Sequence, residues 1–270
     1  MDRVPFAALP MPDARPGFIS ATHGLRLLPS ERLLLENEGE TPEPEFVGIG
    51  DPIYNLADSR RPASLVTANV NRARGNFSLA RLAGSGREIA SAASLSGLPA
   101  ELLTGSSATG QHVNAALRKR PELIHIATHI VSPDGQPSRA AIALSLTKEG
   151  MPELLTSEVI ATFRVPGSLV VLSGCSSEQG EIVPSEGLVG LSRAWLLAGA
   201  AAVIVSGWPT PDDSGVFFTS FYRQLRAQRS GTLATRAAAA LGLAQLEMQN
   251  DHSYRSSPAF WAAYSVISKE

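Results

Sequence analysis

The sequence has 270 residues, a mass of 28.5 kDa and 44% hydrophobic residues, which indicates one large folded domain or two small ones and excludes a disordered or fibrous protein. A net charge of −2 at pH 7 is too balanced for a dedicated nucleic-acid-binding protein or a polybasic membrane-surface protein. The single cysteine, Cys175, excludes an internal disulfide framework and a cysteine-based zinc site.

The first sixty residues are rich in proline and in acidic residues, which is typical of irregular structure. The start of the chain has no apolar run of the kind found in signal peptides, and no segment approaches the roughly 20 apolar residues that span a bilayer. We therefore expect a cytoplasmic protein. Residues 1–44 are expected to form an irregular segment, either a truncated junction or a self-contained start, and residues 45–270 one domain.

From residue 45 onward, short apolar runs alternate with helical patterns, which predicts a mostly parallel sheet covered by helices on both faces. The second helix is expected to start near Thr109, and the third to have Thr156 or Ser157 as its N-cap. The expected strands cover residues 45–49, 100–103, 123–128, 141–146, 169–173, 201–206 and 259–267. The expected helices cover residues 86–95, 108–118, 156–163, 187–198, 214–228 and 232–248.

Two of the expected strands run into residues that can carry nucleophilic chemistry, His129 and Cys175. Because sites in open α/β sheets form at the carboxyl ends of strands, both side chains would share one edge if the two strands are parallel neighbours. The imidazole could then take the proton of the thiol, whose free pKa of about 8.5 keeps it mostly protonated at neutral pH. A structural alternative stays open, in which the cysteine is a small buried hydrophobe and the histidine has no catalytic role.

The segments around these two residues resemble the CHAT domain, a caspase-like cysteine peptidase domain often attached to tetratricopeptide repeats. The resemblance covers about residues 45 to 267 and opens with a strand at 47–52 and a helix at 86–89. Its other motifs are His125-Ile-Ala-Thr-His129, Leu172-Ser-Gly-Cys175, residues 187–199, residues 203–209 with Asp212, residues 221–225 and residues 258–264.

The resemblance implies a caspase-like three-layer α/β/α sandwich that hydrolyses amides through an acyl-enzyme. His129 would be the general base and Cys175 the nucleophile, and the backbone N–H groups of Ile130 and Cys175 would hold the oxyanion. The family usually has glycine after the histidine. Ile130 keeps an N–H, but it disfavours positive φ and narrows the approach to the carbonyl, so reduced activity or a site that opens only on activation is an expected alternative.

Two other histidines need a separate interpretation. Ala21-Thr-His-Gly24 matches the family's histidine motif better around His23, but no apolar strand precedes it and it lies 152 residues before Cys175, so we favour His129. His125 would share a strand face with His129. A metal-binding histidine pair would lack a completing carboxylate, so we expect His125 to support the sheet and expect neither a metal nor a cofactor.

Acidic residues outnumber basic ones after the expected nucleophile, since residues 165–222 contain five acids and one base, Arg193. If these loops line the substrate cleft, they favour a basic residue at P1, with Asp212 as the pocket floor, Trp208 as a wall and Glu178 as a further contact. Solvent-facing acids are an equally good interpretation, and acids near the thiol would oppose its ionisation. The five acids are Glu178, Glu181, Glu186, Asp212 and Asp213.

The leading hypothesis is a cysteine endopeptidase that cleaves a protein or peptide substrate as a regulated signalling or defence protease. Its further partners would be an activating protein or an upstream repeat region, without direct contact to nucleic acid or membrane. The alternative is a weak or inactive caspase-like domain that binds peptides, and Ile130 is its main support. A nucleotide-binding protein is a third class, but Gly48-Ile-Gly50 lacks a third glycine and a ribose-binding acid.

Overall fold

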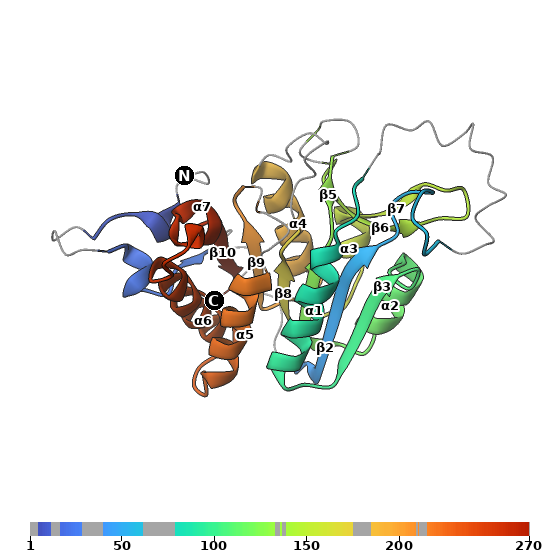
Figure 1. Ribbon diagram of the computed structural model, residues 1–270. Helices are drawn as coiled ribbons and strands as arrows, with labels where there is room; N and C mark the ends of the chain where they lie inside the picture. The colour runs from blue at the N-terminus through green and yellow to red at the C-terminus, as the bar shows by residue number, and fades with distance from the viewer. Residues whose placement is uncertain are drawn as a thin grey trace.

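The structure is a computed structural model that describes residues 5–11, 17–28, 40–61, 79–132, 136, 139–174, 185–208, 210 and 215–269. In these residues a central sheet is formed by β1 (Arg26–Leu27), β2 (Glu43–Pro52), β3 (Ala100–Gly105), β4 (Pro121–Ala127), β8 (Leu169–Leu172), β9 (Ala202–Ser206) and β10 (Tyr264–Ser268). Their order is β1-β10-β9-β8-β4-β2-β3 (Figure 1). Strand β10 is antiparallel to β9, and the other pairs are parallel.

The middle strands of this sheet are continuous apolar runs because helices cover both of its faces. Every residue of β8 and of β9 is buried, and so is every residue of β4 except Glu122. Strand β2 begins exposed and is fully buried from Phe46 onward. The expected mostly parallel sheet is therefore confirmed.

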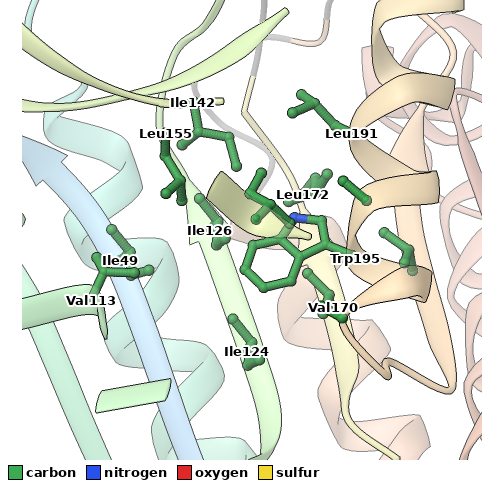
Figure 2. Close-up of a cluster of buried hydrophobic side chains, with 14 of the residues drawn as sticks. Ile49, Val113, Ile124, Ile126, Ile142, Leu155, Val170, Leu172, Leu191 and Trp195 are labelled. Carbon is green, nitrogen blue, oxygen red and sulfur yellow. The ribbon is translucent and has the colours of Figure 1, made fainter. Parts of the chain in front are cut away.

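The helices form one layer on each face of the sheet, and each layer has its own apolar core. Trp195, Leu191, Ile126 and Val170 belong to the first core, and Figure 2 shows the Trp195 ring directed from the helix toward the strand residues. Phe218 and Ala237 belong to the second core. The helices of the first layer are α2 (Gly110–Leu117), α3 (Ser157–Ile160) and α4 (Ser185–Leu197), and those of the second are α1 (Ala83–Ser96), α5 (Gly215–Ala227) and α6 (Leu233–Gln249). The three-layer α/β/α sandwich is thus confirmed.

Two helices begin at the residues that the sequence predicts. Thr109 caps α2 by accepting a hydrogen bond from the backbone N–H of His112, and Thr156 caps α3 by accepting one from the N–H of Val159. Helix α3 ends at Ile160, earlier than expected. Beyond it the chain turns, and Phe163 packs against Trp195 with 6.0 Å between ring centroids.

A second, antiparallel sheet was not expected. It consists of β5 (Ile130–Val131), β6 (Ala141–Leu146) and β7 (Pro152–Thr156), so the strand expected at 141–146 pairs outside the central sheet. The strand expected over 259–267 also proves shorter. Its first part is the short helix α7 (Pro258–Trp261), since a proline at the first helical position favours a helix start, and β10 follows.

Residues 5–28, where described, lie against the C-terminal part of the fold (Figure 1). They contain the short 3-10 helices η1 (Phe6–Ala8) and η2 (Ile19–Ala21), and β1 pairs with β10. The rings of Phe18 and Trp261 are 5.2 Å apart. Of the helices in the described ranges, none has the length and apolar character needed to cross a membrane.

Candidate active site at the ends of β4 and β8

Strands β4 and β8 are direct parallel neighbours in the sheet. Leu123 lies opposite Leu169 and Ile126 opposite Leu172, and the N–H of Ser173 donates to the carbonyl of Ile126 at 3.1 Å. The segments that follow the two strands therefore start at the same edge of the sheet, as the sequence predicts.

Gly174 brings the two strand ends into backbone contact. A Cβ atom built on Gly174 would lie 1.8 Å from the carbonyl oxygen of Thr128, a separation that no real side chain allows. Glycine is required here for space, because its missing Cβ lets the two main chains approach. Gly174 directly precedes Cys175, and Cys175 itself lies outside the described residues.

The ring of His129 is held in one orientation. Its Nε2 lies 2.8 Å from the carbonyl oxygen of Ala80, and because a carbonyl only accepts, Nε2 carries a proton and donates it. In the neutral ring, Nδ1 then has the lone pair. The backbone N–H of His129 donates to the hydroxyl of Tyr54 at 3.2 Å, the two rings are 4.8 Å apart, and His129 is only 2% exposed.

Ile130 occupies an extended position in β5. The N–H of Ala143 donates to the carbonyl of His129, which makes the Ile130–Ile142 pair a non-hydrogen-bonded one and directs the Ile130 N–H away from β6. Among the described residues, positive φ outside glycine occurs at Asp51 and Arg120. Ile130 therefore does not adopt the positive φ that isoleucine disfavours, and its side chain packs in the first core.

A buried polar network lies beneath the candidate site. Nε2 of His125 is 2.9 Å from both the carboxylate of Glu88 and the hydroxyl of Ser173, and Nδ1 is 3.1 Å from the hydroxyl of Tyr222. Burial, and then the charge of Glu88, raise the pKa of Tyr222 well above its ordinary value. Because a carboxylate only accepts, Nε2 of His125 carries a ring proton, and in the neutral ring Nδ1 then accepts from the hydroxyl of Tyr222, which the raised pKa keeps protonated.

This network refines the expectation for His125. It is fully buried and supports the sheet, but a carboxylate does lie beside it, contrary to what we expected from the sequence. The burial of Glu88 could have been predicted from its place on the apolar face of α1, where Ser85, Ile89 and Ala92 are also buried. No cluster of three or more His, Cys, Asp or Glu side chains suited to a metal ion occurs within the described ranges.

The expected substrate-binding residues are only partly described. The indole N–H of Trp208 donates to the carbonyl of Ala259 at 2.9 Å, and the ring is half-buried against the second core. Glu178 and Asp212 lie outside the described residues. His23 is exposed, with Nδ1 2.8 Å from the hydroxyl of Thr22, and its segment lies along α6.

The comparisons with known proteins agree with this architecture. Residues 1–269 match the family model described as "CHAT domain". Tetratricopeptide repeat protein 28 of Homo sapiens is 32% identical over 204 residues, and that of Mus musculus is 29% identical over 206 residues. Each match covers 62% of this chain and 8% of the relative, so the chain corresponds to a small part of these proteins.

The fold also has a counterpart of known structure. The Arg-specific cysteine proteinase gingipain R superposes with a TM-score of 0.50 at 9% sequence identity, over 92% of this chain and 50% of the gingipain chain. At this identity the similarity concerns the fold alone.

Proposed function

The chain belongs to the CHAT domain family, and we propose that it is a cysteine endopeptidase that uses Cys175 as nucleophile and His129 as general base. The contact between Gly174 and Thr128 carries this proposal. His129 follows Thr128, and Cys175 follows Gly174 at the fixed spacing of about 3.8 Å between consecutive Cα atoms. The Cα atoms of the two proposed catalytic residues are therefore each one residue away from the point where the two main chains meet.

The proposed reaction uses Nδ1 of His129 as the proton carrier. Nδ1 takes the thiol proton while Sγ of Cys175 forms a bond to the substrate carbonyl carbon, and the carbonyl becomes an oxyanion. The C–N bond then breaks as Nδ1 gives its proton to the departing amine. Water attacks the thioester, its proton passes to Nδ1, and the C–S bond breaks to release the acid and restore the thiol.

The oxyanion would be held by backbone N–H groups of Ile130 and Cys175. The orientation of the Ile130 N–H supports this role, because a donor used by β6 would not be available to substrate. We further propose a basic P1 residue, with Asp212, Trp208 and Glu178 around its side chain, from the acidic composition of residues 165–222.

An electrophilic peptide probe tests the proposal, because the chain has one cysteine and labelling has one possible site. We expect the wild type to be labelled, and His129→Ala to be labelled roughly 100-fold more slowly. His252→Ala changes an exposed histidine and should behave as the wild type. Iodoacetamide provides a second measurement, since it reports whether a small reagent reaches the thiol.

The burial of His129 favours one alternative, a caspase-like domain that binds peptides with little or no cleavage. If iodoacetamide modifies Cys175 while the peptide probe does not, or if the probe reacts equally well with His129→Ala, the peptidase proposal is contradicted. Saturable peptide binding that survives Cys175→Ala would then support the binding module. Its relatives in tetratricopeptide repeat proteins fit an attached repeat region as a partner in either case.

A further inference from the structure

We propose that Asp51 is a positioning residue for His129, acting through Arg81 and the carbonyl of Ala80. The inference rests on the proposed function, because it concerns the proton-accepting nitrogen of the proposed general base. Asp51 does not touch His129. The connection consists of an ion pair, two consecutive residues of main chain and one hydrogen bond.

Asp51 lies at the carboxyl end of β2 and is 8% exposed. Its carboxylate accepts two hydrogen bonds from Arg81, from Nε at 2.9 Å and from Nη2 at 2.8 Å, and two from Arg60, at 2.7 and 3.0 Å. Bidentate pairs of this kind fix the direction of the guanidinium as well as its distance. The backbone N–H of Asp51 donates to the hydroxyl of Ser85 at 2.7 Å.

The two arginines differ in how far they depend on Asp51. Arg60 also donates two hydrogen bonds to the carboxylate of Asp58, from Nε at 3.0 Å and from Nη2 at 2.7 Å. Arg81, in contrast, donates to one carboxylate among the described residues, that of Asp51. The side chain of Arg81 is half exposed, so without this carboxylate little would fix its position.

The segment 79–81 is held by residues that follow β2 in the chain. The side-chain amide of Asn55 donates to the carbonyl of Leu79 at 3.1 Å, and the side chain of Leu79 packs beside Tyr54. Asp51 holds the other end through Arg81. Ala80 lies between these two anchors, with its side chain exposed and its carbonyl 2.8 Å from Nε2 of His129.

The backbone of Asp51 adopts a conformation that few side-chain-bearing residues have. Its φ is +45°, a conformation that is costly for a side-chain-bearing residue and persists only where its surroundings enforce it. A Cβ on Gly86, in the first turn of α1, would lie 3.2 Å from the Cβ of Asp51, so the helix start also encloses it. Strained residues of this kind gather at functional sites.

The chemical consequence concerns the tautomer of His129. Donation from Nε2 to the Ala80 carbonyl keeps the proton off Nδ1, the nitrogen that would accept the thiol proton. If the carbonyl shifts, the tautomer with the proton on Nδ1 becomes populated, and that tautomer is unable to act as the base. A loss at Asp51 should therefore slow the proton transfer while leaving substrate contacts intact.

The test compares Asp51→Asn with Asp58→Asn. Asparagine tolerates positive φ, so the first variant removes charge without changing the backbone preference. The second removes one negative charge from the same cluster but leaves the Asp51–Arg81 pair. Nitrogen chemical shifts of the His129 ring, followed against pH, report the tautomer, and peptide-probe labelling of Cys175 reports its reactivity.

We expect Asp51→Asn to give a mixture of His129 tautomers and roughly 100-fold slower labelling, and Asp58→Asn to match the wild type within about twofold. Arg81→Met removes the other partner of the same ion pair and should give the same result. It replaces Asp51→Asn as the test variant if Asp51→Asn does not fold. An unchanged His129 tautomer in the folded variants, or equal losses in Asp51→Asn and Asp58→Asn, would overturn the inference. Failure of the proposed function looks different, because the wild type would then not be labelled while the ring shifts would still distinguish the variants.

Discussion

Main-chain groups control the geometry around His129. The carbonyl of Ala80 decides which ring nitrogen carries the proton, and the missing Cβ of Gly174 decides how near the β8 end comes to it. The hydroxyl of Tyr54 accepts the backbone N–H of His129 itself. Substitutions that leave every candidate catalytic side chain in place should therefore still change the site.

Gly174→Ala is the first such substitution. The new Cβ would meet the Thr128 oxygen at 1.8 Å, so one of the two backbones must shift just beyond the paired residues of β4 and β8. We expect the free energy of unfolding to fall by roughly 3 kcal/mol or more, at the upper end for overpacking, and probe labelling of Cys175 to be lost. Urea unfolding and labelling measure the two effects.

Gly207→Ala is the matched control, because Gly207 also follows a buried strand. Its added Cβ would lie 3.5 Å from the nearest atom, the carbonyl oxygen of Ala263, which is an ordinary contact. We expect a change in stability under about 1 kcal/mol. Equal destabilisation by the two variants would show that the close approach at Gly174 is not what limits substitution.

The basic P1 preference is a second prediction at this scale. If Asp212 forms the pocket floor, probes with Arg or Lys at P1 should label faster than probes with Asp or Leu, and Asp212→Asn should remove most of that advantage. Asp213→Asn removes an equal charge from the neighbouring residue and should preserve the preference for a basic P1 residue. Labelling rates that do not depend on P1 would contradict the idea.

At the scale of elements, the strands and helices of the sandwich were predictable because their apolar runs and periods are strong. The small sheet was not, since β5 has two residues and β7 contains Pro152 and the polar Glu153. The adjacency of the β4 and β8 ends was predictable, because it depends on the strand pattern, and the structure shows the two strands as parallel neighbours. The hydrogen bond from His129 to the carbonyl of Ala80 could not be predicted from the sequence, because every residue has a backbone carbonyl.

The buried network joins α1, β4, α5 and the residue that directly follows β8, through Glu88, His125, Tyr222 and Ser173. Tyr222→Phe removes the donor to Nδ1 of His125 and leaves a buried acceptor without its partner. We expect the free energy of unfolding to fall by about 1–2 kcal/mol at pH 7. Tyr254→Phe, at a residue that is 59% exposed, should change it by less than about 0.5 kcal/mol.

The pH dependence of this difference follows from the raised pKa of Tyr222. The folded protein holds the phenol proton more tightly than the unfolded chain, where the pKa is about 10. The contribution of Tyr222 to the free energy of unfolding is therefore fully present below pH 10. It declines by up to about 1.4 kcal/mol per pH unit as the pH rises from there toward the pKa of Tyr222 in the folded protein. Tyr222→Phe lacks this decline, so the difference between the two proteins should shrink above pH 10; a constant difference would contradict the assignment.

For the whole molecule, the central sheet separates two apolar cores, and the candidate site lies where β4 and β8 end between them. The described part of residues 5–28 contributes to the second core alone, through Ala7 and, at its margin, Ala8, Phe18 and Leu25. The sequence suggested an irregular leading segment because of its prolines. Irregular backbone nevertheless buries apolar side chains here, an effect that periodicity does not reveal.

Removal of residues 1–28 should therefore destabilise the whole fold. The deletion removes Ala7 from the second core and Phe18 from its contact with Trp261. It also exposes the outer edge of β10, which β1 covers at Val266 and Ile267. We expect a loss of about 3 kcal/mol or more in the free energy of unfolding and a new tendency to associate through the bare edge, since unpaired strand edges recruit other strands. Urea unfolding and light scattering measure both, with deletion of residues 1–4 as the control. If the longer deletion unfolds at the same urea concentration and scatters no more light than the full chain, residues 1–28 are dispensable for the fold.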